Sequence, residues 1–219
     1  MIKKLMTGVL ALVFFFSIFG LYGCGQGLPT LEIEEKAACV GDLVKINVSL
    51  SEAPNGVSGY NITWTLSNAS VAEIESIELP DWGDNFLSKN STLPAASVYA
   101  RAIDIGMQIE ENATDIPIIT LGLRAKAHGH TTIYVSRLRM DDDDDRRIHP
   151  IIENGTLEVW QRNGDLNGNG KSADIGDVAL MWNAYWGFVE SDCRYDLNGD
   201  GIEAGIGDVL LIWKLWQNS

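Results

Sequence analysis

The sequence predicts a mainly β chain: a β-sandwich of the jelly-roll type followed by a small α-helical module. Two observations support this fold class. Between residues 30 and 161, short runs of alternating apolar and polar residues are separated by Gly, Asn, Asp and Pro, and no run has a long helical period. After residue 163, one segment occurs twice at an offset of 31 residues, and each copy ends in an apolar, helix-like run.

The expected strands are identified by their period of two. Residues 60–66 alternate so that Tyr60, Ile62 and Trp64 share one face of a strand, followed on that face by Leu66. The other expected strands cover residues 43–50, 71–79, 98–105, 118–125, 131–138 and 155–160. A segment of roughly 130 residues is long enough to bury a sandwich core without help from disulfides.

Composition limits the classes of partner. The chain has 219 residues, enough for one or two domains, with 30 Asp and Glu against 16 Lys and Arg. Phosphate binding requires a basic surface, so we expect no nucleic-acid partner.

The first 24 residues have the features of a targeting segment. Lys3 and Lys4 precede residues 5–23, which are uncharged and largely apolar, as in a secretory signal. This run is also long enough to span a membrane. Residues 21–24, Leu-Tyr-Gly-Cys, resemble the lipobox of secreted lipoproteins, which implies lipidation of Cys24. A lipid anchor, an uncleaved membrane anchor and a soluble export signal all stay open, and each places the rest of the chain outside the cell.

Two cysteines remain after Cys24. Cys39 and Cys193 lie far apart in the sequence, and a disulfide framework normally needs more cysteines than two. We therefore expect each to be a small buried apolar residue.

Acceptor sequences for N-glycosylation support export independently. Six N-x-S/T motifs occur, at Asn47, Asn61, Asn68, Asn90, Asn112 and Asn154. None lies in the C-terminal repeats. This distribution predicts a glycosylated outer domain followed by an unglycosylated one.

The first half of each repeat has the chemistry of a calcium loop. Oxygen-bearing side chains occupy the first, third and fifth places and glycine the sixth, and an acid follows at the start of the helix. A plain Asn-Gly turn would explain one such run, but not two in register with matching acids. We therefore predict two Ca²⁺ ions. The expected ligands are Asp165, Asn167, Asn169, the carbonyl of Lys171 and Asp177 in the first loop, and Asp196, Asn198, Asp200, the carbonyl of Ile202 and Asp208 in the second.

The closing acid lies one residue beyond the twelfth place of the usual loop in both repeats, so we interpret the loops as a variant. Asp174 is a lower-ranked extra ligand, because its counterpart in the second repeat is Gly205.

Each loop is followed by one helix, expected over residues 178–186 and 209–216. This duplicated loop-helix plan over residues 163–219 resembles type I dockerins, in particular an archaeal subtype with the same Asn-Gly-Asn-Gly and Gly-Asp-Val wording. The resemblance implies calcium-dependent folding and a cohesin partner. It implies partner contacts at Asp174, Ile175, Gly205 and Ile206, with Lys214 at the rim.

The two helices are rich in aromatic residues, namely Trp182, Tyr185, Trp186, Trp213 and Trp216. So small a unit cannot easily bury all five. We expect some to pack the helices together and the others to be exposed anchors of an interface.

The first domain, over residues 30–161, resembles cohesin domains. The similarity lies in residues 40–46, residues 56–66, a hairpin over residues 119–135, the Asp-rich turn at residues 141–145 and the closing residues 155–159. It implies a sandwich that receives dockerins of other proteins.

Two further clusters are weighed as metal sites. His128 and His130 flank Gly129, for which we expect a turn rather than a metal pair. The Asp run at residues 141–145 is followed by Arg146 and Arg147. A solvated, partly self-neutralised turn is therefore expected there rather than a further calcium site.

Three functions compete. The leading hypothesis is a non-catalytic extracellular scaffold or adaptor that is attached to the cell surface and assembles proteins by cohesin–dockerin binding, including head-to-tail self-association. The alternative is a carbohydrate-binding module, which would need Trp64, Trp82 and Trp160 in one exposed row. A small secreted hydrolase is the third, but no catalytic set of residues is recognisable, so we expect no enzyme.

Overall fold

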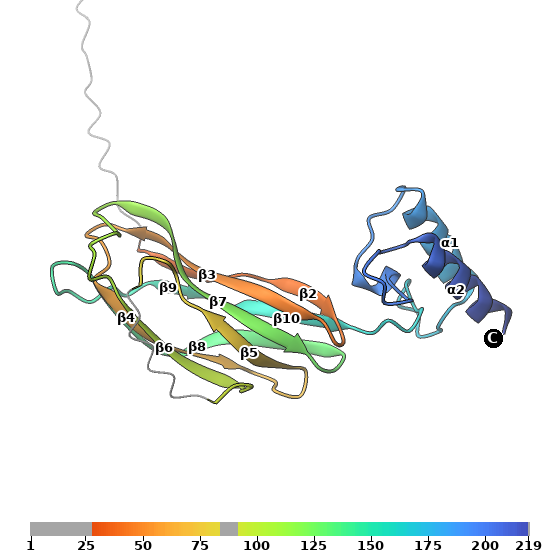
Figure 1. Ribbon diagram of the computed structural model, residues 1–219, viewed down its shortest axis with the longest axis horizontal. Helices are drawn as coiled ribbons and strands as arrows, with labels where there is room; N and C mark the ends of the chain where they lie inside the picture. Colours follow the sequence, from red (N-terminus) through yellow and green to blue (C-terminus); the bar gives the residue numbers. More distant parts are fainter. Residues whose placement is uncertain (1–27, 84–91, 219) are drawn as a thin grey trace, which may run out of the picture.

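The computed structural model describes residues 28–83 and 92–218. Two β-sheets pack face to face, and two helices form a separate C-terminal module at one end of the sandwich (Figure 1). The targeting segment with Cys24, and the glycosylation motif at Asn90, lie outside the described residues. In the part of the chain that is described, no helix is long and apolar enough to cross a membrane.

Each sheet has five strands. The first has the order β5 (Ala72–Glu78), β7 (Ala113–Ala125), β3 (Leu43–Ala53), β1 (Thr30–Ile33), β9 (Ile151–Glu153). The second has the order β2 (Lys36–Cys39), β10 (Gly155–Trp160), β8 (Gly129–Asp141), β4 (Gly59–Leu66), β6 (Ser97–Ile103). The pairs β1–β9 and β2–β10 are parallel, whereas the other neighbours are antiparallel. The prediction of a mainly β sandwich is confirmed.

The core lies between the sheets and is formed by alternate residues of each strand. In β4, Tyr60, Ile62 and Trp64 are buried while the residues between them are partly exposed, as predicted. Leu121 and Leu123 of β7 are fully buried opposite them in the same cluster. The sequence analysis did not predict β1, β2 and β9, because strands of three or four residues are too short to show a period.

Both helices begin three residues earlier than expected. Helix α1 spans Ile175–Tyr185 and α2 spans Ile206–Gln217, after N-caps at Asp174 and Gly205. The predicted closing acids therefore lie inside the first helical turn, where the helix dipole favours a negative charge.

A disulfide joins the two domains. Cys39 and Cys193, 154 positions apart in the sequence, are bonded with their Cα atoms 5.7 Å apart, so the expectation of two separate apolar cysteines was wrong. The register of β2 on β10 explains the contact, since it places Cys39 opposite Trp160, where the chain leaves the sandwich. The 3-10 helix η1 (Cys193–Tyr195), between the two repeats, returns to the same point.

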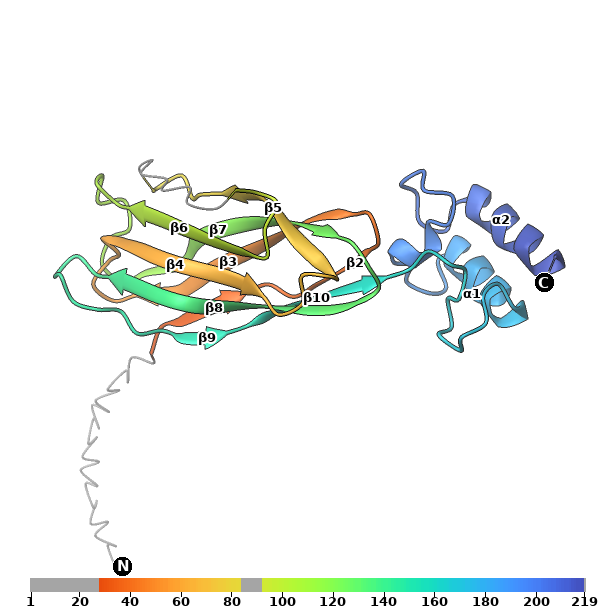
Figure 2. The same cartoon turned by 90° about the horizontal axis from the view of Figure 1, so that it is seen from below.

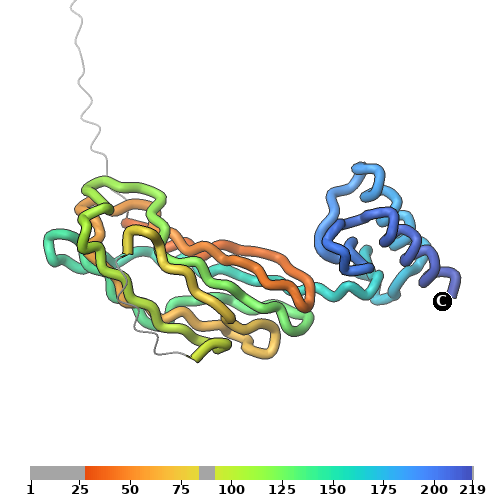
Figure 3. The backbone as a smooth tube through the Cα atoms, in the orientation of Figure 1, coloured from red at the N-terminus to blue at the C-terminus, as the bar shows by residue number. Residues whose placement is uncertain are grey.

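Polar contacts reinforce the junction. Arg162 donates to the Asp42 carboxylate at 2.8 Å and to the Cys193 carbonyl at 3.2 Å, so one guanidinium contacts both domains. The Arg194 guanidinium lies 4.8 Å from the ring centre of Trp160. The C-terminal module is thus held at one end of the sandwich, whereas β1 begins at the opposite end (Figures 2 and 3).

The disulfide makes a prediction that peptide mapping checks. In a chain beginning at Leu28, alkylated and digested with trypsin without reductant, residues 37–45 should remain linked to residues 172–194, because cleavage follows Lys36, Lys45, Lys171 and Arg194. Digestion after reduction is the control and should release the two peptides separately. Alkylation of both cysteines before reduction would contradict the pairing.

Candidate functional site

The sequence repeat of the C-terminal module is also a repeat of backbone conformation. Gly170 and Gly201 have φ of 83° and 84°, and Ala173 and Ala204 have φ of 54° and 50°. Left-handed backbone is normal for glycine but uncommon for alanine. Its recurrence at the same offset shows that both loops take one specific path.

The first acid of each loop organises the turn. Asp165 accepts hydrogen bonds from the backbone N–H groups of Asn169 and Gly170, at 3.0 and 2.8 Å. Asp196 accepts the two equivalent bonds in the second loop, at 3.0 and 3.2 Å. The loops therefore curl around their own carboxylates, which brings the predicted ligand side chains to the inside of the turn.

The predicted closing acids are fully buried and join the loop to the helix. Asp177 accepts from the N–H groups of Leu166 (2.8 Å) and Asp174 (2.9 Å), and Asp208 does the same with Asn198 and Gly205, both at 2.9 Å. Neither carboxylate forms an ion pair with a basic side chain in the described part of the chain. A buried carboxylate without a cationic partner is expensive, so these positions favour a bound cation.

The second loop passes a test of fit for calcium. One oxygen each from Asp196, Asp200 and Asp208 lies within 4.8 Å of the other two. Three carboxylates at such distances repel one another, and a divalent cation among them removes the repulsion. Oxygen donors alone, from side chains and a backbone carbonyl, are the set that calcium prefers. The predicted carbonyl donors Lys171 and Ile202 stay predictions.

The first loop reaches the same charge by another route. Asn169 replaces the acid of Asp200, but the Asp174 carboxylate accepts from Asn169 Nδ2 at 2.7 Å and from Asn167 Nδ2 at 3.3 Å. The bond from Asn169 holds the pKa of the Asp174 carboxyl below its usual value. Asp174 therefore belongs to the first loop as well as to the expected partner surface, but among the described residues three acids within 4.8 Å of one another occur in the second loop and not in the first. The lower rank of Asp174 as a metal ligand stays a prediction.

The two helices of the C-terminal module expose matching apolar stripes. On α1 the stripe runs through Ile175 and Trp182 to Trp186, which are 61, 37 and 64% exposed. On α2 the stripe runs through Ile206 and Leu210 to Trp213, at 54, 63 and 40%, and Ile206 and Trp213 are the counterparts of Ile175 and Trp182 in the repeat. Residues spaced by four and three positions share one helix face, so each set forms one surface. We call these two sets the helix stripes.

The C-terminal module has a small core compared with its exposed apolar surface. Its core has eight members, among them Val178 and Met181 of α1 and Val209 and Ile212 of α2. Trp216 packs against this core, whereas the other four predicted aromatics are exposed. Sequence analysis missed Leu210 and also Phe188, which is 79% exposed after α1. Among the predicted partner residues, Ile175 and Ile206 lie on the helix stripes, Gly205 is the N-cap of α2, and Lys214 is exposed.

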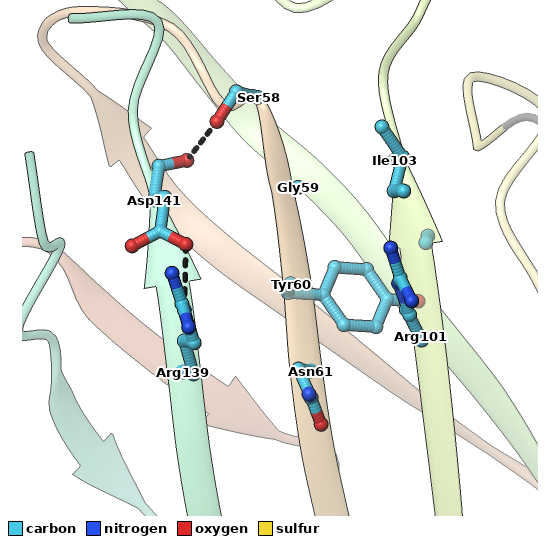
Figure 4. Close-up of a pocket in the computed structure, with 9 residues that line it drawn as sticks. Ser58, Gly59, Tyr60, Asn61, Arg101, Ile103, Arg139 and Asp141 are labelled. Atoms are coloured by element: carbon cyan, nitrogen blue, oxygen red, sulfur yellow. Dashed lines mark hydrogen bonds and ion pairs between the residues drawn. The ribbon is translucent and has the colours of Figure 1, made fainter. Parts of the chain in front are cut away.

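A second exposed surface lies on the outer face of the sheet that contains β4, β6 and β8. The register places Arg101, Asn61 and Arg139 in one row across the three strands, and Arg137 faces Thr63 in the next row. This row lines a pocket in which Arg139 donates to Asp141 at 2.9 Å (Figure 4). In a chain with net charge −14, this arginine row is a local basic surface.

The expected glycosylation motifs differ in exposure. Asn47, Asn68, Asn112 and Asn154 are exposed. Asn61 is half-buried in the arginine row, and its side-chain oxygen is buried without a hydrogen-bond partner. Glycan attachment at all six motifs stays a prediction.

The structure bears on two alternatives considered from the sequence, the histidine pair and the row of tryptophans. Gly129 is the first residue of β8 and pairs with Val159, so the bend lies at residues 127–128 and not at Gly129 as expected. His128 Nδ1 lies 2.9 Å from the carbonyl oxygen of Val159. Trp64 and Trp82 are buried in the sandwich core, at 0 and 5% exposure. The exposed row of three tryptophans required of a carbohydrate-binding surface is therefore not formed.

The Asp-rich turn is only partly the solvated turn that was expected. Asp141 pairs with Arg139 and Arg147, and Asp144 pairs with Arg146, so the self-neutralised part of the prediction is correct. Asp142, however, is buried, because its side chain accepts the backbone bonds that shape the turn.

Comparison with known proteins identifies the fold of the sandwich. No family model matches the chain, and no curated protein matches it. Solved structures similar to it include the sixth cohesin of scaffoldin B from Acetivibrio cellulolyticus, in complex with a Cel5 dockerin mutant (20% identity, TM-score 0.53, covering 61% of this chain and 100% of that one). A cohesin in the Coh-OlpC–Doc435 complex of Clostridium thermocellum is also similar (17% identity, TM-score 0.53, 61 and 94% covered).

A third similar structure is a non-cellulosomal cohesin from the archaeon Archaeoglobus fulgidus (14% identity, TM-score 0.51, 66% of this chain and 100% of that one). At these identities the likeness establishes the fold alone. The sandwich of this chain has the fold of cohesin domains.

Proposed function

We propose that this chain is a non-catalytic adaptor outside the cell that assembles proteins through calcium-dependent cohesin–dockerin binding. The carrying observation is that a sandwich of cohesin fold and a tandem of calcium-type loops occur in one chain, each with an exposed face. The C-terminal module would dock on a cohesin domain, and the sandwich would receive a dockerin module.

Calcium would act on the C-terminal module by neutralising the loop carboxylates, three of which lie within 4.8 Å of one another in the second loop. The module has a core of only eight residues, so metal binding would supply much of its folding free energy. Folding in turn sets the start of each helix, and with it the helix stripes. Docking is therefore expected to depend on calcium.

The arginine row supports the second half of the proposal. Residues 163–219 carry nine acidic and three basic side chains, so such a module remains acidic even with two calcium ions bound. Arg101, Arg137 and Arg139 present the opposite charge on an exposed sheet face. Opposite charges at an interface accelerate association and exclude wrong partners. Cohesins of similar fold have been solved with dockerins bound.

The junction makes binding within one chain unfavourable. The Cys39–Cys193 disulfide and the contacts of Arg162 hold the C-terminal module at the end of its own sandwich. Its helix stripes would therefore meet the arginine row of a second chain, or the cohesin of another protein. Head-to-tail chains are one arrangement that this geometry permits.

Attachment to the outside of the cell is part of the proposal. An interdomain disulfide is stable in an oxidising compartment, in agreement with the signal-like N-terminal segment and the glycosylation motifs. Anchoring through Cys24 or through an uncleaved segment would hold the adaptor at the surface.

The closing acid of the second loop makes a prediction about calcium affinity. Replacing Asp208 by Asn should lower the calcium affinity of the second loop about 10- to 100-fold, because a charged contact contributes about 1.5–3 kcal/mol. Isothermal titration calorimetry with calcium, on a chain beginning at Leu28, measures this affinity. Glu203→Gln is the matched control, since Glu203 is an exposed acid in the same loop that bonds to Ser191. Unchanged calcium binding in Asp208→Asn would argue against the loop.

The helix stripes make a prediction about partner binding. A chain that begins at Leu28 is immobilised on a resin and exposed to cell-envelope proteins. The resin should retain proteins with cohesin or dockerin modules in the presence of calcium, and EGTA should release them. Ile206→Asp should reduce retention at least tenfold, because it places a charge in a desolvated contact. Lys45→Asp, on the outer surface of β3, should retain them unchanged. Equal retention in EGTA, or selective retention of polysaccharide, would contradict the proposed function.

A further inference from the structure

An acidic corner lies at the end of the sandwich far from the C-terminal module, where the Asp-rich turn follows β8. Arginines neutralise Asp141 and Asp144 of this turn, and Asp142 is satisfied by backbone N–H groups and by Asn55. These pairings do not include Asp143, which is exposed to solvent at the turn.

Asp104, just after β6, contributes a second carboxylate. It is 7% exposed, and its Oδ2 accepts from the backbone N–H of Ile109 at 2.7 Å. Its Oδ1 is buried and has no hydrogen-bond partner. A buried, unpartnered carboxylate oxygen calls for a ligand, because desolvation without compensation is unfavourable.

Gly56 shows that the two segments converge. A Cβ atom there would collide with Asp143 Oδ2 and would lie 2.7 Å from the carbonyl oxygen of Ile109. Both oxygens therefore crowd one point, next to the residue whose N–H binds Asp104. Desolvation by the surrounding chain and the negative charge of Asp104 raise the pKa of the Asp143 carboxyl.

The corner has no cation of its own among residues 28–83 and 92–218. No described Lys, Arg or His forms an ion pair with Asp104 or Asp143, because the arginines of the turn pair with Asp141 and Asp144. Asp143 Oδ2 and the Ile109 carbonyl thus share one point, the Asp104 carboxylate binds the N–H of the same Ile109, and the exposed Asp143 leaves one side open to solvent.

We propose that this corner is a calcium site of the sandwich, formed by Asp104, Asp143 and the carbonyl of Ile109 with water completing the shell. The donors are all oxygens on irregular segments, which suits the flexible coordination of Ca²⁺ better than the strict octahedron of Mg²⁺. With two carboxylates the site belongs to the weak class, with a dissociation constant on the order of 10⁻⁴–10⁻³ M. The ion ties the segment after β6 to the turn after β8, the two strands that carry the arginine row.

Calcium stoichiometry tests this site independently of the C-terminal loops. Equilibrium dialysis with radioactive calcium, at free calcium of about 1 mM, compares the chain from Leu28 with Asp104→Asn and Asp143→Asn. Each variant should bind roughly 0.5–0.9 ion fewer per chain than the unchanged protein, the occupancy that such a dissociation constant gives at this concentration, whatever number the C-terminal loops bind. Asp145→Asn is the matched control, since Asp145 is exposed in the same turn at a φ of 61°, which asparagine adopts readily.

The second variant and the control allow the test to decide even if one variant does not fold. If Asp104→Asn fails to fold, Asp143→Asn decides alone, because its side chain is exposed. Equal stoichiometry in Asp143→Asn and the unchanged protein would overturn the site. So would the same loss in Asp145→Asn, because it would show only a general effect of charge.

Discussion

The C-terminal module depends on the carboxylates of Asp177 and Asp208. Each is fully buried and bonds both to the first residues of its loop and to the residue that caps the following helix. Loop path, helix start and exposed stripe are therefore coupled through one side chain in each repeat. The core around Met181 and Ile212 is small, and under the proposed function a calcium ion offsets the repulsion among the loop acids.

The junction gives the sandwich and the C-terminal module a defined relation. Two domains joined by a short linker would normally reorient freely. Here the Cys39–Cys193 bond and the contacts of Arg162 connect them at three points near the end of β10. If the chain is an adaptor, it would hold its two partners in a fixed relative orientation, because the arginine row and the helix stripes keep fixed directions relative to each other.

Much of this arrangement follows from local patterns in the sequence. The alternation of Tyr60, Ile62 and Trp64 predicted β4 and its buried face, and the 31-residue offset predicted both loops and both helices. These signals work because a strand period or a repeat is written in neighbouring residues. The fold of the sandwich was also expected, from short motifs that resemble cohesin domains.

The missed features depend on distant residues. Cys39 meets Cys193 because β2 pairs in parallel with β10, a register that no local pattern encodes. The hydrogen bond from Asn169 to the Asp174 carboxylate was not predicted either, because it joins side chains five positions apart across a turn. Asp104 and Asp143 are 39 positions apart, and only the fold brings both to the surroundings of Ile109.

The central claim, that calcium organises the C-terminal module, is tested most directly by circular dichroism at 222 nm during a calcium titration. In a chain beginning at Leu28, every helix of the described residues belongs to this module, so the helical signal reports on it alone. Helical signal should rise as calcium is added and fall again with EGTA, while the β signal of the sandwich persists. A helical signal that is the same in calcium and in EGTA would contradict the account.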